Sequence, residues 1–428
     1  MNILLLGSGG RENALAWKMK QSHHCNNLFI APGNAGTNLI GINVSIDVND
    51  FESQKQFCIE KNIDIVVVGP EEPLVNGVFD YYKKDELLQH IIVVGPSAKA
   101  AQLEGSKAFS KQFMQTYKIP TATYAEFSVS EIEEAKKYIQ QHSLPIVVKA
   151  DGLAAGKGVI ICETTEHAIS VVEDMLIHKQ FGKASDKVVV EEFLNGIELS
   201  VFALTNGKDY KIIGHAKDYK RVGEGDTGLN TGGMGCVSPV AFADEIFLQK
   251  VEETIIKPTI SGLEKEELIY NGFVFFGLMN CNGTPYVIEY NCRLGDPETE
   301  VILPRLETDL VSLFAAMGNN TLADANIEFF EESFATIMAV SGGYPSTYKT
   351  NYIIHNLNNL KTEKDILIFH AGTKQNENGE IVTNGGRVLA VTAKGSSIKN
   401  AVEKSIHVLN SISFEGMYFR RDIGYEFK

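Results

Sequence analysis

The segment from Lys149 to Gly158 combines lysine and glycine in a pattern suited to phosphate binding. Lys149 ends an apolar, β-branched run, and Gly152, Gly156 and Gly158 follow it, with Lys157 between the last two. Glycine lets the backbone approach a ligand closely, and exposed backbone N–H groups bind phosphate oxygens. The lysines add positive charge at the same place. The pattern therefore predicts a loop that covers the phosphates of a nucleotide.

This loop does not have the spacing of a P-loop. Three residues separate Gly152 from Gly156, where a P-loop has four, and Gly158 stands where a Ser or Thr would bind magnesium. A P-loop also opens a helix, whereas Val159–Cys162 has the composition of a strand. We therefore expect a mobile phosphate-covering loop that joins the two strands of a β-hairpin.

Glu289 and Asn291 lie two residues apart in a run that reads as a strand. Residues i and i+2 of a strand share a face, so both side-chain oxygens can reach one hard cation. Magnesium takes one or two such oxygens and completes its shell with water and phosphate. A solvated strand end is the alternative, but Arg293 has the same parity and Asp296 follows in an acidic turn. The segment favours a divalent metal site.

A second buried run ends in Glu191, Glu192, Phe193 and Leu194, and it allows two interpretations. The acids can be an ordinary solvated hairpin end. The segment can also be an interdomain hinge, whose backbone amide and carbonyl would bind the edge of an adenine. In that case Glu198, on the next strand, could accept a hydrogen bond from a ribose hydroxyl.

A glycine turn near the N-terminus contains Gly9 and Gly10 and resembles a dinucleotide fingerprint without completing it. Glu12 stands where the third glycine belongs, and no acid follows at the required distance. Bare N–H groups at a helix start still suit a phosphomonoester, although a plain strand-to-helix turn is the alternative. The neighbouring turns could complete such a pocket, one with Pro32, Gly33 and Asn34 and another with Gly69, Pro70 and Glu71.

The segment from Asp218 to Gly235 is dense in glycine and charge. Lys220 and Arg221 stand near its start, and glycines recur through the rest. A glycine-rich surface loop costs much conformational entropy to order, which favours a ligand-binding role.

The apolar runs of the sequence predict the strands and helices that would position these residues. Strand and helix signals alternate over residues 1–103, which predicts a parallel, doubly wound sheet with ligands beyond its strand ends. Residues 104–330 should form a second unit, with a small α+β lobe at about 121–193, and residues 331–428 a strand-rich third unit. A capping box at Ser130 and Glu133 predicts a helix through Gln141, and Asn282–Gly283 predicts a hairpin turn. The fold class is α/β.

Composition excludes several classes of function. The net charge is −15, which argues against binding nucleic acid or an anionic membrane surface. The six cysteines form no C-x-x-C pair, as expected for reduced thiols of a cytoplasmic protein. No signal peptide or membrane-spanning run is visible. No G-x-S-x-G elbow is present, which disfavours nucleophilic triad chemistry.

The order of these motifs resembles that of the ATP-grasp superfamily, with Lys107 as a further basic residue upstream of Lys149. Longer motifs along essentially the whole chain resemble the phosphoribosylamine–glycine ligase family, also called glycinamide ribonucleotide synthetases. These motifs are Gly7–Ala14, Pro32–Gly36, Gln102–Lys107, Asn230–Gly235, Asn291–Thr299 and Gly385–Val388. The resemblance implies a preATP-grasp domain at the N-terminus, an ATP-grasp core with its lid lobe, and a C-terminal domain. It also implies a cytoplasmic enzyme, which we expect to be a monomer.

The family's reaction is the ATP-dependent ligation of glycine to 5-phosphoribosylamine through glycyl phosphate, a step of de novo purine synthesis. By resemblance, ATP would be bound by Lys107, Lys149, Gly152, Gly156, Lys157, Gly158, Glu191, Glu192, Phe193, Leu194 and Glu198. Mg²⁺ or Mn²⁺ would be held by Glu289 and Asn291. The glycine and transition-state side would be lined by Arg293, Asp296, Asp218 and Lys220. The sugar phosphate would be bound by Gly9, Gly10, Asn13, Pro32, Gly33, Asn34 and Gly235.

Some positions depart from the family pattern. Asn13 replaces a more common His, and an amide can still donate a hydrogen bond to phosphate. Tyr219, Glu224 and Leu229 also differ, which affects the fine contacts of the Asp218–Gly235 segment. Two alternatives remain open: another ATP-grasp ligase with a different acceptor, and a nucleotide-binding sensor without turnover.

Overall fold

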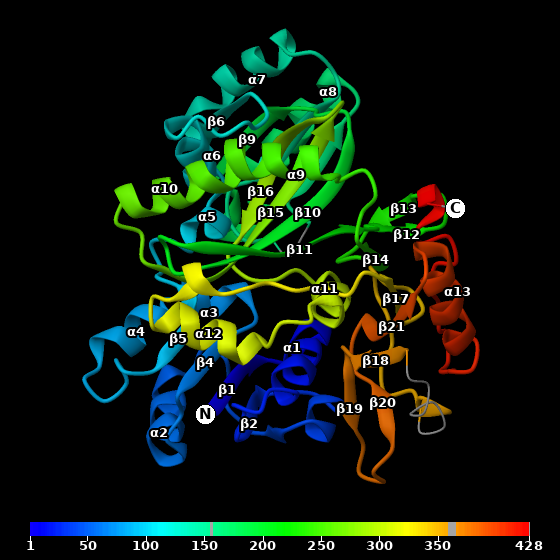
Figure 1. The fold of residues 1–428 in the computed structure, drawn as a ribbon. Helices are drawn as coiled ribbons and strands as arrows, with labels where there is room; N and C mark the ends of the chain where they lie inside the picture. The colour runs from blue at the N-terminus through cyan, green and yellow to red at the C-terminus, as the bar shows by residue number, and fades with distance from the viewer. Residues whose placement is uncertain (155–156, 358–364, 428) are drawn as a thin grey trace.

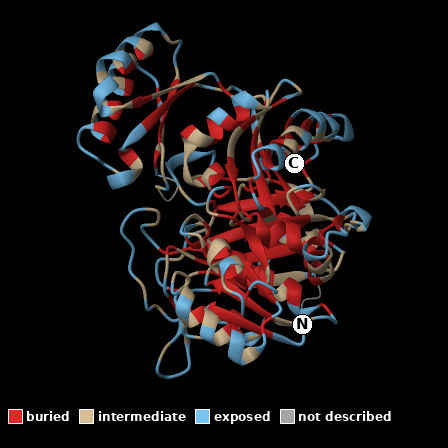
Figure 2. Ribbon diagram, turned by 90° about the vertical axis from the view of Figure 1, so that its left-hand side faces the viewer, coloured by how far each residue is buried: buried red, intermediate tan, exposed pale blue. Residues whose placement is uncertain are grey.

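The computed structural model of the chain describes residues 1–154, 157–357 and 365–427. Its main feature is a thirteen-stranded mixed sheet that runs through most of the molecule. Buried residues concentrate on this sheet, while exposed residues lie on the outer faces of the helices and on loops (Figure 2). A separate four-stranded sheet belongs to a lobe at one end of the molecule (Figure 1).

The N-terminal unit is a parallel sheet in the order β3–β2–β1–β4–β5. Its strands are continuous apolar runs because helices cover both faces. The strands are β1 (Asn2–Gly7), β2 (Asn27–Pro32), β3 (Ile42–Asn43), β4 (Ile65–Val68) and β5 (Ile92–Pro96). The helices are α1 (Gly10–Lys20), α2 (Phe51–Lys61), α3 (Glu71–Val75) and α4 (Val78–Lys84). The predicted parallel sheet is confirmed.

The central unit joins this sheet through β15 (Tyr270–Cys281), which pairs antiparallel with β5. β15 also pairs with β10 (Ile197–Thr205) and β16 (Thr284–Asn291), and β10 pairs with β11 (Tyr210–Asp218). The turn between β15 and β16 has positive φ at Asn282 (52°) and Gly283 (83°), as a primed hairpin turn requires. The predicted hairpin is confirmed.

The lobe is a sheet in the order β6–β9–β7–β8 with two helices packed on it. Its elements are β6 (Tyr124–Ser128), α7 (Ile132–Gln141), β7 (Ile146–Ala150), β8 (Val159–Cys162), α8 (Thr165–Leu176) and β9 (Lys187–Glu192). β7 and β8 pair antiparallel, so the glycine-rich segment does connect a hairpin. The predicted capping box is wrong: Ser128 and Glu131 form it, because a short 3₁₀ turn precedes α7.

The C-terminal unit extends the same large sheet. β14 (Gly235–Ser238) pairs with β11 on one side and with β17 (Ser333–Val340) on the other. β21 (Arg387–Gly395) and β18 (Ile366–His370) follow β17, and α13 (Ile398–Leu409) packs against them. β19 (Thr373–Gln375) and β20 (Ile381–Thr383) form a small separate ribbon.

The remaining helices connect the three units. α5 (Gln102–Gly105) and α6 (Lys107–Thr116) lead from the N-terminal unit towards the lobe, and α9 (Glu245–Val251) and α10 (Lys257–Lys265) cover one face of the central sheet (Figure 1). α11 (Thr299–Arg305) lies at the middle of the molecule against α1, with α12 (Leu310–Gly318) after it. α11 therefore sits where the three units meet.

Candidate active site

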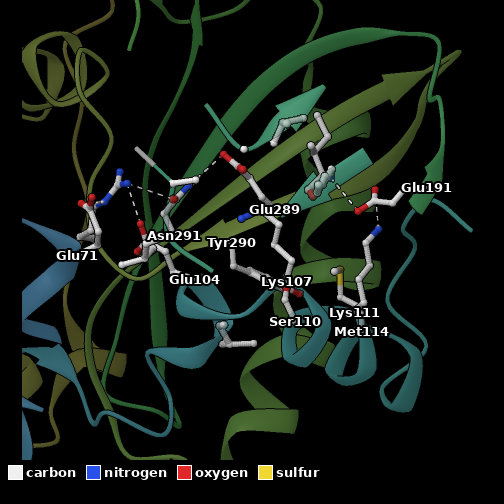
Figure 3. A pocket seen from close by; sticks show the side chains of 18 residues that line it. Glu71, Glu104, Lys107, Ser110, Lys111, Met114, Glu191, Glu289, Tyr290 and Asn291 are labelled. Carbon is white, nitrogen blue, oxygen red and sulfur yellow. Dashed lines mark hydrogen bonds and ion pairs between the residues drawn. The ribbon is translucent and has the colours of Figure 1, made fainter. Parts of the chain in front are cut away.

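A polar pocket lies between the lobe and the β15–β16 hairpin, and we call it the lobe pocket. Its volume is about 170 Å³. Figure 3 shows side chains from α6, β9 and β16 directed into it. The charged residues that line it are Glu71, Glu104, Lys107, Lys111, Lys149, Glu191, Glu289 and Arg293. Four of these, Lys107, Lys149, Glu191 and Glu289, were expected to bind ATP or its metal.

Glu289 and Asn291 lie together at the end of β16. The strand has a bulge beside Ile288, and the Nδ2 of Asn291 donates to Glu289 Oε1 at 3.4 Å. Burial alone would raise the pKa of Glu289, but the positive charges of Lys220, Lys149 and Lys107 outweigh burial and lower it. The carboxylate is therefore ionised, and the amide oxygen of Asn291, which accepts from Arg293, lies on the same side chain as the nitrogen that faces Glu289. A carboxylate and an amide are oxygen donors of the kind that a hard cation such as Mg²⁺ takes.

The structure offers this site few protein ligands. Within the described ranges, no group of three or more His, Cys, Asp or Glu side chains could hold a metal ion. A cation at Glu289 and Asn291 would need water or phosphate oxygens for the rest of its shell, which is the usual arrangement for Mg²⁺ bound with a nucleotide.

Three buried charges of the lobe pocket form a chain. Glu191 Oε1 lies 3.0 Å from Lys149 Nζ, and Glu191 Oε2 lies 3.0 Å from Lys111 Nζ. All three residues are buried, and Lys149 also donates to the carbonyl of Ile288 at 3.2 Å. Burial lowers the pKa of Lys111 to about 8. The sequence reasoning overlooked Lys111, although it lies four residues after Lys107 and so on the same face of α6.

The hinge after β9 is only partly inside the pocket. Glu191 lines it, whereas Glu192, Phe193 and Leu194 do not, and Glu192 Oε1 accepts from the backbone N–H of Thr123 at 2.8 Å. Phe193 is exposed. Adenine binding by this segment stays a prediction.

Lys220, in the glycine-rich Asp218–Gly235 segment, lies near Glu289 of the lobe pocket. Its Nζ pairs with Glu198 and lies 3.2 Å from Asp218. Burial alone would lower the pKa of Lys220, but Asp218 and Glu198 raise it well above its usual value. Lys220 is thus a permanent cation, and the structure brings together three residues that were expected to face the substrates.

Arg293 is held by Glu71 and Glu104. The turn containing Glu71 was expected to complete the phosphomonoester pocket instead, and Glu104 was noted only inside a motif of the resemblance. The NH2 of Arg293 lies 2.8 Å from Glu104 and its Nε lies 3.4 Å from Glu71. NH2 also donates to Asn291 Oδ1 at 3.3 Å. Both acids come from segments distant in sequence, α3 and α5, so residue spacing did not link them to Arg293. Arg293 therefore connects the end of β16 to the N-terminal unit.

A second pocket of about 300 Å³ lies where the N-terminal and C-terminal units meet, and we call it the junction pocket. The expected residues Gly9, Gly10, Gly33, Asn34 and Asp296 line it. Asn384 and Arg387 of the C-terminal unit line it too, with backbone around Gly372, and sequence reasoning missed them. The motif containing Arg387 was noticed only as part of the resemblance.

Asp296 and Arg387 form the charged centre of the junction pocket. Arg387 NH2 lies 3.0 Å from Asp296 Oδ1, and the backbone N–H of Arg11 donates to Asp296 Oδ2 at 3.3 Å. Burial alone would raise the pKa of Asp296, but Arg387 and Arg11 lower it. Asp296 is thus an ionised carboxylate inside the pocket.

Several expected residues lie elsewhere. Asn13 is buried and its Oδ1 accepts from the backbone N–H of His370 at 2.8 Å, so it supports the pocket wall. Pro32 is exposed at the end of β2, and Gly235 pairs with Ile337 in the large sheet; neither lines a pocket. Gly156 lies outside the described residues. Gly152 and Lys157 do not line the lobe pocket, whereas Gly158 does.

Comparison with known proteins identifies the family. The model of the phosphoribosylglycinamide synthetase N domain matches residues 1–104, that of the ATP-grasp (A) domain matches 105–299, and that of the C domain matches 334–426. The chain belongs to the phosphoribosylglycinamide synthetase family. The family expected from the motifs is confirmed.

Relatives of this family match the chain over nearly its full length. The phosphoribosylamine–glycine ligase of Vibrio parahaemolyticus is 46% identical, over 99% of this chain and 98% of the relative. The enzyme of the same name from Escherichia coli strain K12 is 44% identical over the same shares. The crystal structure of the Thermotoga maritima phosphoribosylamine–glycine ligase has a TM-score of 0.84 and 33% identity, covering 99% of this chain and 100% of that one.

More distant structures share the fold alone. The biotin carboxylase domain of the Hydrogenobacter thermophilus 2-oxoglutarate carboxylase, solved with MgADP, has a TM-score of 0.72 and 16% identity, covering 97% of this chain and 91% of that one. The expected ATP-grasp fold, with its N-terminal and C-terminal domains, is confirmed. No helix in the described part of this synthetase-family chain is long and apolar enough to cross a membrane.

Proposed function

We propose that the chain is a phosphoribosylamine–glycine ligase, which joins glycine to 5-phosphoribosylamine and converts ATP to ADP and phosphate. The observation that carries this proposal is the match of all three family domains, supported by relatives at 44–46% identity over 99% of the chain. The product, glycinamide ribonucleotide, places the enzyme in de novo purine biosynthesis.

The chemistry needs two consecutive displacements. A carboxylate is a poor acyl donor, so a glycine oxygen first attacks the γ-phosphorus of ATP, and ADP leaves with the electron pair of the broken bond. The amine of phosphoribosylamine then attacks the acyl carbon of glycyl phosphate. The new C–N bond replaces the C–O bond, phosphate leaves, and the nitrogen loses a proton. The enzyme must hold several anions together and offset their repulsion.

The lobe pocket has the charges for the first displacement. Lys107 and Lys149 face Glu289 across it and would contact ATP phosphates, and the loop from Gly152 to Gly158 would close over them. Glu289 and Asn291 would hold Mg²⁺ or Mn²⁺, which would neutralise phosphate charge when bound. Glu191 and the segment to Leu194 would hold adenine, and Glu198 the ribose.

The junction pocket has the groups for the second substrate. Gly9 and Gly10 open α1, where backbone N–H groups suit a phosphate, and Gly33 and Asn34 line the same pocket. Asp296 would face the amine. Arg293, with Asp218 and Lys220, would line the path to glycine between the two pockets.

The remaining expectations concern the setting of the enzyme. We propose that it works as a cytoplasmic monomer on small molecules, with neither nucleic acid nor membrane as a partner. The net charge of −15 supports the absence of anionic macromolecular partners. Sedimentation analysis tests the monomer directly.

The decisive experiment is an ADP-release assay with each substrate omitted in turn. ADP formation should require both glycine and freshly generated phosphoribosylamine, and glycinamide ribonucleotide should accumulate in equal amount. ADP formation that ignores glycine but follows another carboxylate would show a different ATP-grasp ligase. Nucleotide binding without any turnover would show the sensor.

A further inference from the structure

Glu300 is a completely buried acid behind the junction pocket. It lies in the first turn of α11 with an exposed fraction of 0%. Neither of its carboxyl oxygens accepts a hydrogen bond from an N–H or hydroxyl donor among the residues the structure describes. An ionised carboxylate enclosed without donors is very costly. The geometry therefore requires the carboxyl group of Glu300 to be neutral and to carry its proton.

A neutral carboxyl group has one O–H to donate, and the neighbouring acceptor is Asp296. Both carboxyl groups lie against the start of α1, Asp296 beside Gly9 and Glu300 beside Gly10, and their interaction holds the pKa of Asp296 down and that of Glu300 up. Burial and the charge of Asp296 together keep the pKa of Glu300 well above its usual value. A proton on Glu300 would thus give Asp296 a third donor, beside Arg387 and the N–H of Arg11.

Elements on every side of Glu300 fit this neutral state. Gly10 of α1 packs so closely that a Cβ there would collide with Glu300 Oε1. Cys236 of β14 is buried, and Arg387 of β21 is already engaged by Asp296 and by the carbonyl of Gly232. Thr392 donates to the backbone carbonyl of Glu300 and leaves the carboxyl group untouched. Arg387 is the cation whose charge reaches Glu300, and Asp296 offsets it.

We propose that Glu300 is a protonated positioning residue that orients Asp296 and keeps the junction pocket free of a second negative charge. The inference rests on the proposed function, because its purpose is to let a phosphorylated amine enter this pocket. With Glu300 neutral, the negative charge of Asp296 and the positive charge of Arg387 cancel. With Glu300 ionised, the same cluster would carry an extra negative charge next to the site of an anionic sugar phosphate.

The first test measures the protonation of Glu300 through thermal stability. An acid with a raised pKa in the folded state keeps its proton there but loses it in the unfolded chain, so stability falls as pH rises above the unfolded pKa of about 4.3. Glu300→Gln cannot lose a proton at this position. The melting temperature of the variant minus that of the wild type should therefore increase from pH 5 to pH 8. Glu307→Gln, at an exposed acid after α11, is the matched control. A difference that does not change with pH would overturn the proposal.

The second test measures the effect on substrate binding. Above the pH at which the difference in melting temperature stops changing, Glu300 is ionised in the folded protein, and the KM for phosphoribosylamine should rise more in the wild type than in Glu300→Gln, by about tenfold. The ratio of the two enzymes cancels the titration of the substrate and of every other shared group. The KM for ATP should have the same pH dependence in both. Equal KM profiles for phosphoribosylamine would overturn the proposal.

A third comparison separates positioning from a merely structural role. Gln can still donate to Asp296, so Glu300→Gln should keep most of the turnover, whereas Glu300→Ala should lose at least about tenfold. Equal losses in both variants would contradict the proposal. If Glu300→Gln does not fold, Glu300→Leu, which is neutral and similar in size, takes its place in the thermal series. If the wild type makes no ADP with glycine and phosphoribosylamine, the proposed function fails, while the thermal series still decides the state of Glu300.

Discussion

In the lobe pocket, buried charged side chains are stabilised by neighbours of opposite charge. Three lysines outweigh the burial of Glu289 and lower its pKa, and Glu191 forms ion pairs with two buried lysines. Removing one partner of such a group leaves a buried charge without compensation, which costs more than the pair contributes. The sharpest predictions at the residue scale therefore concern these acids and lysines.

Glu289→Gln should weaken the metal dependence of the reaction without unfolding the protein. The amide keeps the shape of the side chain but removes the only charged oxygen of the Glu289–Asn291 pair, so half-saturating Mg²⁺ should rise about tenfold or more. Initial rates over a Mg²⁺ series measure this, and Glu264→Gln, at an exposed acid of α10, is the control. Unchanged turnover at limiting Mg²⁺ would exclude Glu289 from the metal site.

Lys111→Met should raise the KM for ATP by about tenfold. Glu191 would then depend on Lys149 alone, and Lys149 would have to serve the carboxylate and the phosphates together. Because burial lowers the pKa of Lys111 to about 8, the wild type should itself lose ATP affinity as pH rises from 7 to 9, and the variant should not. Initial rates against ATP at each pH test this. A similar change in Lys118→Met, at an exposed position after α6, would refute the specific role.

The spacing of residues in the sequence predicted site residues that lie close together on one short segment. It did not predict those that come together only when distant segments fold against each other. Glu289 and Asn291 are two residues apart on one strand, so alternation alone places them together. Glu104 and Arg387 reach the site from distant segments, and nothing local distinguishes them from ordinary surface charges. The resemblance supplied part of what spacing could not.

At the scale of elements, the glycine-rich segment after Asp218 shows where sequence reasoning falls short. It was expected to be a loop, but it contains a two-stranded hairpin, β12 (Arg221–Gly223) and β13 (Thr227–Asn230). The glycine-rich composition does not indicate strands here, because contacts with the C-terminal tail stabilise them. Arg420 is completely buried there and pairs with Asp226 and Asp422.

Asp422→Asn should loosen this hairpin and slow turnover several-fold. Asp422 accepts from Arg420 and from the N–H of Gly225, while the hairpin base holds Lys220 through Thr231. The loss of a charged hydrogen-bond partner should lower the free energy of unfolding by about 2 kcal/mol. Melting temperatures measure this effect, and Glu415→Gln, at an exposed acid of the same tail, is the control.

The pH dependence of that difference has a definite sign. Burial alone would raise the pKa of Asp422, but Arg420 lowers it. A lowered pKa gives a stabilising contribution that is complete above the unfolded value of about 3.9 and disappears as pH falls through the folded value. The gap between the wild type and Asp422→Asn should stay constant from pH 6 to pH 8 and shrink below about pH 4. A gap that persists in acid would contradict the ion pair as its source.

At the scale of the whole molecule, one continuous sheet joins three units that the sequence presents one after another. β5 pairs with β15 where the N-terminal unit joins the central unit, and β14 pairs with β17 where the central unit joins the C-terminal unit. Both junctions are therefore strand pairs between segments distant in sequence. Alternating strands and helices predicted each unit by itself, but no local pattern specifies these pairings. These strand pairs place the β15–β16 side of the lobe pocket and the junction pocket in one frame, with α11 between the units.

This frame predicts that the two pockets can be impaired separately. Arg387→Met removes the cation that balances Asp296 in the junction pocket, so it should raise the KM for phosphoribosylamine at least about tenfold and leave the KM for ATP nearly unchanged. Lys149→Met, in the lobe pocket, should have the reverse effect, because its ammonium group faces Glu191 and Glu289. Initial rates with each substrate varied in turn measure both constants. If either variant raised the two constants together, the pockets would not be separate binding sites held by one frame.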